Sequence, residues 1–165
     1  LGGLGHLGVQ IAAAMGAEVT VLSQTMAKEA DGMRLGATHY YATSDPGTYK
    51  LLRGHFDLII NTVAANLPVD KYLAMLRLDG AMINVGIPTE PDTYGVFSLT
   101  TQRRTLSGST IGGLPETQEM LDFCAEHAIG SLIELIGVND VDDAYERVIK
   151  SDVRYRFVID TSTFD

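Results

Sequence analysis

The chain has 165 residues, of which 45% are hydrophobic and 20% charged, a composition that is ordinary for one globular domain with its own core. A formal net charge of −9 excludes the broad basic surface by which proteins neutralise nucleic-acid phosphates, so we expect no nucleic-acid partner. The sequence holds no apolar run of about 18 residues and no signal-peptide pattern. We therefore expect a cytoplasmic protein without a membrane partner.

Helical and strand patterns alternate along the chain. The apolar periodicity predicts helices at 6–15, 27–35, 68–77, 98–103, 115–127 and 141–150. It predicts strands at 18–23, 38–41, 56–61, 81–86, 105–111, 132–136 and 156–159. Residues 78–80 are predicted to form a turn, and the strand at 56–61 is apolar enough that we expect it to be covered on both faces. The alternation predicts an α/β fold with a Rossmann-type, doubly wound parallel sheet.

A glycine-rich turn precedes the first helix. Gly2, Gly3, Leu4 and Gly5 lack only an earlier glycine to complete Gly-x-Gly-x-x-Gly. Glycines let a backbone approach a pyrophosphate, and the N–H groups at a helix start attract the anion. The alternative is a tight turn into a helix without a ligand. Because the first strand of the sheet should directly precede this turn, we expect that strand and an N-terminal portion to be missing.

The strand at 18–23 ends where a dinucleotide fold places the residue that contacts the adenosine ribose. NAD-binding sites carry a carboxylate here, which would repel the 2′-phosphate of NADP. This sequence has Ser23, Gln24 and Thr25, followed by Lys28, which supply hydroxyl donors and a cation instead. The pattern favours NADP. The alternative is a polar turn in which Ser23 or Thr25 caps the next helix.

These motifs resemble the medium-chain dehydrogenase family, and in particular its cinnamyl alcohol dehydrogenase group. The resemblance is carried by the stretches at 1–10, 19–25, 34–37, 78–86, 106–113, 119–124 and 152–160. It implies that the glycine turn holds the pyrophosphate and that Ser23, Thr25 and Lys28 hold the 2′-phosphate. The further cofactor contacts that it implies are Thr62 and Val63 on the ribose side, Val85, Gly86 and Ile87 against the nicotinamide, and Ser109 and Ile111 at the carboxamide.

The resemblance implies an NADP-dependent, zinc-type alcohol dehydrogenase or aldehyde reductase that moves hydride between NADP(H) and a small alcohol or aldehyde. In that family a separate catalytic domain supplies the zinc ligands. Here Cys124 is the only cysteine, and His6, His39, His55 and His127 lie at no ligand spacing. We therefore expect no metal site and no catalytic residue in this chain, and no activity from it alone.

The resemblance also implies how the chain is organised. Residues 1–131 would form the NADP-binding domain, and residues 132–165 would pack on the catalytic domain. A homodimer would form through the edge strand near 106–111, unless the helix at 115–127 covers that edge. Two other functions stay open: a zinc-free quinone or enoyl reductase, and a non-catalytic NADP-binding module.

Overall fold

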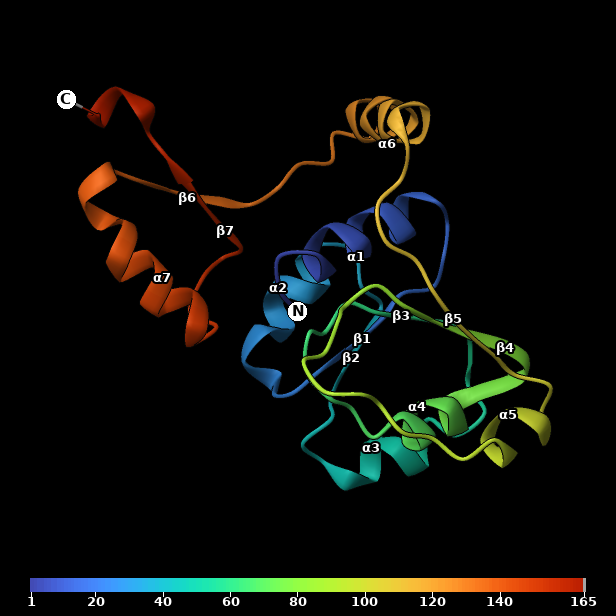
Figure 1. Cartoon of the computed structure of the whole chain (residues 1–165). Coiled ribbons are helices and arrows are strands. Elements are labelled where there is room, and N and C mark those ends of the chain that lie inside the picture. Colours follow the sequence, from blue (N-terminus) through green and yellow to red (C-terminus); the bar gives the residue numbers. More distant parts are fainter. Residues whose placement is uncertain (165) are drawn as a thin grey trace. The chain divides into compact units, whose positions relative to one another are not determined.

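The computed structural model describes residues 1–164, and its helices and strands alternate along the chain (Figure 1). The helices are α1 (Gly5–Ala14), α2 (Glu29–Arg34), α3 (Pro46–Leu51), α4 (Val69–Met75), α5 (Phe97–Thr100), α6 (Leu114–Glu126) and α7 (Val141–Ile149). The strands are β1 (Thr20–Ser23), β2 (His39–Ala42), β3 (Phe56–Asn61), β4 (Leu76–Asn84), β5 (Thr105–Gly108), β6 (Ile133–Ile136) and β7 (Arg156–Ile159). Three short 3-10 turns are η1 (Met26–Lys28), η2 (Val138–Asp140) and η3 (Thr161–Thr163). The expected alternation is confirmed.

The chain divides into two compact units, which we describe separately. The first unit contains residues 1–40 together with the residues from Glu116 onward, and the second contains residues 41–115. The expected boundary between residues 131 and 132 stays a prediction. No helix among residues 1–164 is both long and apolar enough to cross a membrane.

In the first unit, α1 and α2 pack with β1 and β2 around a small core. The buried residues of this core are Val9, Val21, Ala37 and Tyr40. A Cβ on Gly32 of α2 would lie 2.8 Å from the Tyr40 ring, so a glycine lets α2 approach β2 closely. Two helices are thereby fixed against one short pair of strands.

In the second unit, β3, β4 and β5 form a parallel sheet in the order β3-β4-β5. Helix α4 and the start of β4 contribute most of the core, because Leu73, Met75, Leu76 and Met82 have no exposed surface. The carboxyl ends of the three strands lie at the same edge, where Asn61 is opposite Asn84 and Asn84 is opposite Gly108. Open parallel sheets bind ligands at such an edge.

The predicted turn at 78–80 lies inside β4 as a bulge. Phe56 is opposite Leu76, whereas Leu58 is opposite Ala81, so β4 carries extra residues over this stretch. Asp79 adopts a left-handed φ of 63°, its N–H donates to the Gln102 carbonyl at 3.0 Å, and its carboxylate accepts from Arg103 Nε at 2.8 Å. The Asp-Gly pair therefore bends the backbone, as predicted, but hydrogen bonds to residues 102 and 103 keep it in the strand.

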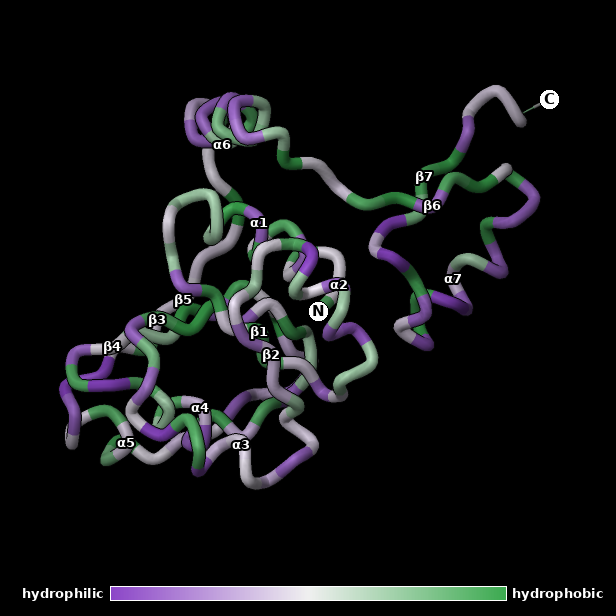
Figure 2. The backbone as a smooth tube through the Cα atoms, turned by 180° about the vertical axis from the view of Figure 1, so that it is seen from behind, coloured by the Kyte–Doolittle hydropathy of each residue, from purple (hydrophilic) through white to green (hydrophobic). Residues whose placement is uncertain are grey.

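One face of β3, which we expected to be covered on both faces, is exposed, and apolar side chains of α6 are exposed as well. Leu58 and Ile60 of β3 are 51% and 54% exposed, so this strand is covered on one face rather than on both. Helix α6 buries none of its residues, and Met120 and Leu121 on its apolar side are 43% and 52% exposed. Strands β6 and β7 are also rich in hydrophobic residues (Figure 2), and Leu135 in β6 is exposed. An apolar pattern shows what a surface can bury and does not supply the partner that buries it.

The C-terminal part of the first unit is tied to α1 by His6. This side chain is fully buried, and its Nε2 accepts a hydrogen bond from the Leu132 N–H at 3.2 Å. The proton of the neutral ring must then lie on Nδ1, which is 3.2 Å from the Gly2 carbonyl oxygen and donates to it. The ring also stacks on Tyr155, with 4.8 Å between the ring centroids.

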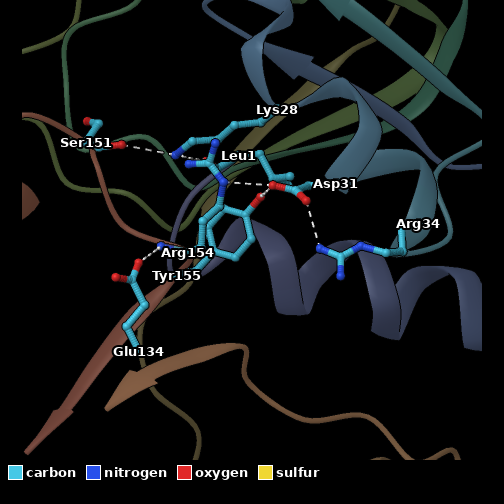
Figure 3. Close-up of polar contacts among 8 residues, drawn as sticks. All are labelled: Leu1, Lys28, Asp31, Arg34, Glu134, Ser151, Arg154 and Tyr155. Atoms are coloured by element: carbon cyan, nitrogen blue, oxygen red, sulfur yellow. Dashed lines mark hydrogen bonds and ion pairs between the residues drawn. The ribbon is translucent and has the colours of Figure 1, made fainter. Parts of the chain in front are cut away.

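A second tie is made by the Asp31 carboxylate of α2 (Figure 3). It accepts hydrogen bonds from the Tyr155 hydroxyl at 2.9 Å and from Arg34 at 2.7 Å, and it forms an ion pair with Arg154 Nε at 2.9 Å. Burial opposes the ionisation of Asp31, but the hydrogen bonds from Tyr155 and Arg34 and the charge of Arg154 outweigh it and lower its pKa. Burial and the bond to Asp31 raise the pKa of Tyr155. The segment around residue 155 is thus held by both stacking and charge.

The His6 tie predicts the effect of His6→Phe on stability. The phenyl ring can keep the stack on Tyr155, and the Gly2 carbonyl keeps the backbone N–H of residue 6, but the Leu132 N–H loses its partner. We expect the free energy of unfolding to fall by about 1–3 kcal/mol, the typical cost of a buried polar group without a hydrogen bond. Urea unfolding of the purified protein measures it. The control is His39→Phe, because His39 is exposed and its ion pair with Glu18 lies at the surface, so this change should cost less than about 1 kcal/mol. Equal losses in both variants would contradict the assignment.

The Asp31 tie predicts a dependence of stability on pH. Because the folded-state pKa of Asp31 is lowered, its stabilisation is present above the unfolded-state pKa of about 3.9 and is lost as pH falls through the folded value. Wild type should therefore lose stability in acid more steeply than Asp31→Asn, and the two should converge at the lowest pH. Unfolding midpoints measured across this range test it, with Asp122→Asn on exposed α6 as the control that keeps the wild-type slope. Parallel curves for wild type and Asp31→Asn would be evidence against the tie.

Candidate functional site

The glycine turn is open toward a ligand. Helix α1 begins at Gly5, and Leu4, at its N-cap position, makes no side-chain hydrogen bond to the first-turn N–H groups. A Cβ added at Gly2 would meet nothing within 4 Å, and one at Gly3 would meet only the Tyr155 carbonyl oxygen, at 3.7 Å. A helix start without a side-chain cap presents N–H groups and a positive dipole end to an anion. The turn therefore fits a pyrophosphate.

The polar residues after β1 lie in the same unit as the glycine turn. Thr25 caps η1, since its hydroxyl accepts from the Ala27 N–H at 3.4 Å, so the capping role that we kept as an alternative is confirmed for Thr25. Ser23 ends β1, and Gln24 after it is exposed. Lys28 Nζ donates to the carbonyls of Leu1 at 3.2 Å and Ser151 at 3.3 Å.

Lys28 lies among charged groups of both signs (Figure 3). Its Nζ lies 5.2 Å from the centre of the Tyr155 ring. Burial, and after it the charge of Arg154, lower the pKa of Lys28, while Asp31 and Asp152 act in the opposite direction. Sequence reasoning missed Asp31 and Arg154, because residues 152–160 entered it only as a family signature. Their position beside Lys28 follows from the fold of the first unit.

The remaining predicted cofactor residues lie in the second unit, at the carboxyl edge of β3, β4 and β5. The N–H groups of Val85 and Gly86 both donate to the Asn61 carbonyl, at 2.8 and 2.9 Å. Gly86 is so close to Val63 that a Cβ would lie 2.5 Å from the carbonyl carbon of Val63. Ser109 is joined to the same edge, because its N–H donates to the Asn84 carbonyl at 3.0 Å. The structure thus brings together the residues that follow three neighbouring strands.

Three further predicted residues are less constrained. Thr62 follows β3 directly, between Asn61 and Val63. Ile87 is 75% exposed and Ile111 is 94% exposed. Exposed aliphatic side chains next to a backbone edge are free to contact a planar ring, but they do not orient it themselves. The order at this edge comes from the backbone.

Asn61 and Asn84 form a pair at this edge that sequence reasoning also missed. Asn61 Nδ2 donates to Asn84 Oδ1 at 3.0 Å, and Asn61 Oδ1 accepts from the Val63 N–H at 3.0 Å. Asn61 is buried. The available signal was an asparagine at the last position of two consecutive buried strands, which parallel pairing places side by side.

The arrangement suits binding and orientation rather than acid–base chemistry. Among residues 1–164, no group of three or more His, Cys, Asp or Glu side chains could hold a metal ion. Backbone amides, one lysine and the edge of a parallel sheet are the groups that hold a dinucleotide.

Comparison with known proteins agrees with this geometry. Residues 3–126 match the family model described as zinc-binding dehydrogenase. The chain is 63% identical over 163 residues to the probable formaldehyde dehydrogenase AdhA of Bacillus subtilis, covering 99% of this chain and 47% of that protein. It is 60% identical over 162 residues to the NADP-dependent alcohol dehydrogenase C of Mycobacterium tuberculosis, covering 98% of this chain and 47% of that protein.

Two solved structures are also similar. The cinnamyl alcohol dehydrogenase SbCAD4 of Sorghum bicolor has a TM-score of 0.95 and 38% identity, over 98% of this chain and 46% of that one. The Helicobacter pylori cinnamyl alcohol dehydrogenase complexed with NADP(H) has a TM-score of 0.87 and 35% identity, over the same shares. The chain spans about half the length of these relatives. By its family model, its relatives and its fold, the chain belongs to the zinc-binding dehydrogenase family.

Proposed function

We propose that this chain binds NADP(H) as the cofactor-binding portion of an NADP-dependent alcohol dehydrogenase or aldehyde reductase. The observation that carries the proposal is the end of β1, where Ser23 stands in place of a carboxylate and Lys28 is held in the same unit as the glycine turn. Similarity to relatives that include NADP-dependent alcohol dehydrogenases supports it.

The adenosine end of the cofactor would be held by charge and by backbone amides. The N–H groups around Gly3 and Leu4 would bind the pyrophosphate, and Ser23, Thr25 and Lys28 would bind the 2′-phosphate. An ammonium has three N–H donors, and the carbonyls of Leu1 and Ser151 use two of them. Lys28 therefore has the capacity to donate to a phosphate without leaving the position in which these carbonyls hold it.

The nicotinamide end would be oriented by the edge of the second unit. Val63 would present its backbone to the ribose, Ser109 and Ile111 would present backbone groups to the carboxamide, and Gly86 and Ile87 would lie against the ring. NADPH supplies the hydride when it is bound, and the protein supplies its orientation. Because residues 1–164 hold no ligand set for zinc, we assign this chain no step of the reaction that depends on the metal.

We also propose that the protein forms a homodimer through β5. Among the described residues, β5 pairs with β4 alone, so one of its edges is available to a second copy. Light scattering on the intact protein should give the mass of a dimer. A monomeric mass would reject this mode of assembly and leave the cofactor proposal untouched.

The substitution Ser23→Asp tests the cofactor. A carboxylate at this position repels a 2′-phosphate and accepts hydrogen bonds from a free ribose hydroxyl, so the preference for NADPH over NADH should fall by about tenfold or more, equal to about 1.4 kcal/mol. Fluorescence titration of the intact protein with each cofactor measures it. The control Ser44→Asp adds the same charge at an exposed position of the second unit and should leave the preference unchanged.

The titrations also separate the alternatives. Wild-type protein that prefers NADPH and reduces an aldehyde supports the proposal. Binding of NADPH without any reduction of aldehydes, quinones or enoyl substrates points to a non-catalytic module. Failure to bind either cofactor rejects the proposal.

A further inference from the structure

We propose that Asn61 and Asn84 are positioning residues that fix the backbone segments receiving the nicotinamide half of NADP. The inference rests on the proposed function and goes beyond it, because neither side chain belongs to the expected contacts. What singles out the pair is its place, at the last paired position of two adjacent parallel strands.

The orientation of the Asn61 amide is set by its neighbours. The Val63 N–H is a donor, so the atom that faces it at 3.0 Å must be the carbonyl oxygen of the side chain. The amide nitrogen then points at the side-chain oxygen of Asn84, 3.0 Å away. Both ends of a buried amide are satisfied in one arrangement, and the flipped arrangement would set donor against donor and acceptor against acceptor.

The pair continues the sheet beyond its last register position. The backbone carbonyl of Asn61 accepts from Val85 and Gly86, and the backbone carbonyl of Asn84 accepts from Ser109. The side chain of Asn61 reaches forward to Val63 and sideways to Asn84. One pair of residues therefore binds the backbone of the three segments that follow β3, β4 and β5.

The tolerance at this edge is small. A Cβ on Gly86 would lie 2.5 Å from the carbonyl carbon and 2.7 Å from the nitrogen of Val63, so these two backbones are in direct contact. A movement of Val63 therefore displaces Gly86 as well. Asn61 holds the Val63 N–H through its side-chain oxygen and the Gly86 N–H through its backbone carbonyl, so one residue fixes both segments.

Two substitutions that add the same charge separate the effect of the hydrogen bond between Asn61 and Asn84 from the effect of the added charge. Asn84→Asp keeps an oxygen that accepts from Asn61 Nδ2. Asn61→Asp keeps the oxygen that accepts from Val63 but replaces the amide donor by a second oxygen, so a hydrogen bond to Asn84 can form again only if the Asn84 amide turns over. Both variants add one negative charge at nearly the same place.

The probes are NADPH and adenosine 2′,5′-bisphosphate, which has the 2′-phosphate and no nicotinamide. In the intact protein we expect Asn61→Asp to weaken NADPH binding by about tenfold and to leave the bisphosphate within about threefold of wild type. Asn84→Asp should leave both ligands within about threefold of wild type. Calorimetric titration gives the dissociation constants, and thermal unfolding reports the fold.

Three other results would count against the positioning role or against the proposed function. If Asn61→Asp binds NADPH like wild type, or weakens both ligands equally, the positioning role is overturned. If wild type binds the bisphosphate and not NADPH, the proposed function fails before the pair is considered. If Asn61→Asp does not fold, Asn84→Ala, which removes the acceptor without adding charge, must show the same selective loss or the inference is rejected.

Discussion

The first unit depends on one buried imidazole. His6 lies between the Gly2 carbonyl, which can only accept a hydrogen bond, and the Leu132 N–H, which can only donate one. Leu132 is 126 residues away from His6 in the sequence. Gly2 belongs to the turn that we assign to the pyrophosphate, and Leu132 leads into β6. The geometry of the glycine turn is thus coupled to the C-terminal segment by a side chain that no ligand needs to touch. Tyr155 adds apolar contact to this hydrogen-bonded tie through its stack on the ring.

An acidic protein can still provide an anion site, because the local arrangement outweighs the net charge of −9. Around Lys28 the chain brings Arg154 and Arg34 together with the carboxylates of Asp31 and Asp152. The Asp31 carboxylate orients the guanidinium groups and the Tyr155 hydroxyl. In the second unit, the residues that we propose for the nicotinamide half of the cofactor present neutral amides. The phosphate end of a dinucleotide is highly charged and suits cationic side chains, whereas the nicotinamide ring is nearly planar and suits neutral amides.

Much of the fold follows from the sequence because period and turn chemistry are local. The strand at 56–61 has the predicted bounds, and α1, α6 and α7 lie within a residue or two of expectation. The bulge in β4 was missed because Asp79-Gly80 has the composition of a turn, and only the contacts of Asp79 with residues 102 and 103 keep it in a strand. The expected coverage of β3 on both faces was wrong for a related reason, since an apolar pattern carries no information about partners.

The candidate site was predictable to the extent that it repeats known motifs. The glycine turn and the Ser23 to Lys28 stretch are contiguous, so their spacing could be judged directly. Asn61 and Asn84 are 23 residues apart, and nothing local distinguishes them from any polar residue that ends a strand. Arg154 and Asp31 are separated still further. Contacts of this kind depend on the register of paired strands and on where distant parts of the chain meet in the fold, and a single sequence shows neither.

The bulge in β4 bears on how such a protein can change over evolutionary time. The additional residues sit near the amino-terminal start of the strand, between Leu76 and Ala81, while the paired positions from Ala81 to Asn84 run without interruption to the carboxyl edge. A change in chain length at the bulge would be absorbed there and would leave the strand register beyond it intact. The start of β4 can therefore vary in length while the ligand-binding edge stays in register.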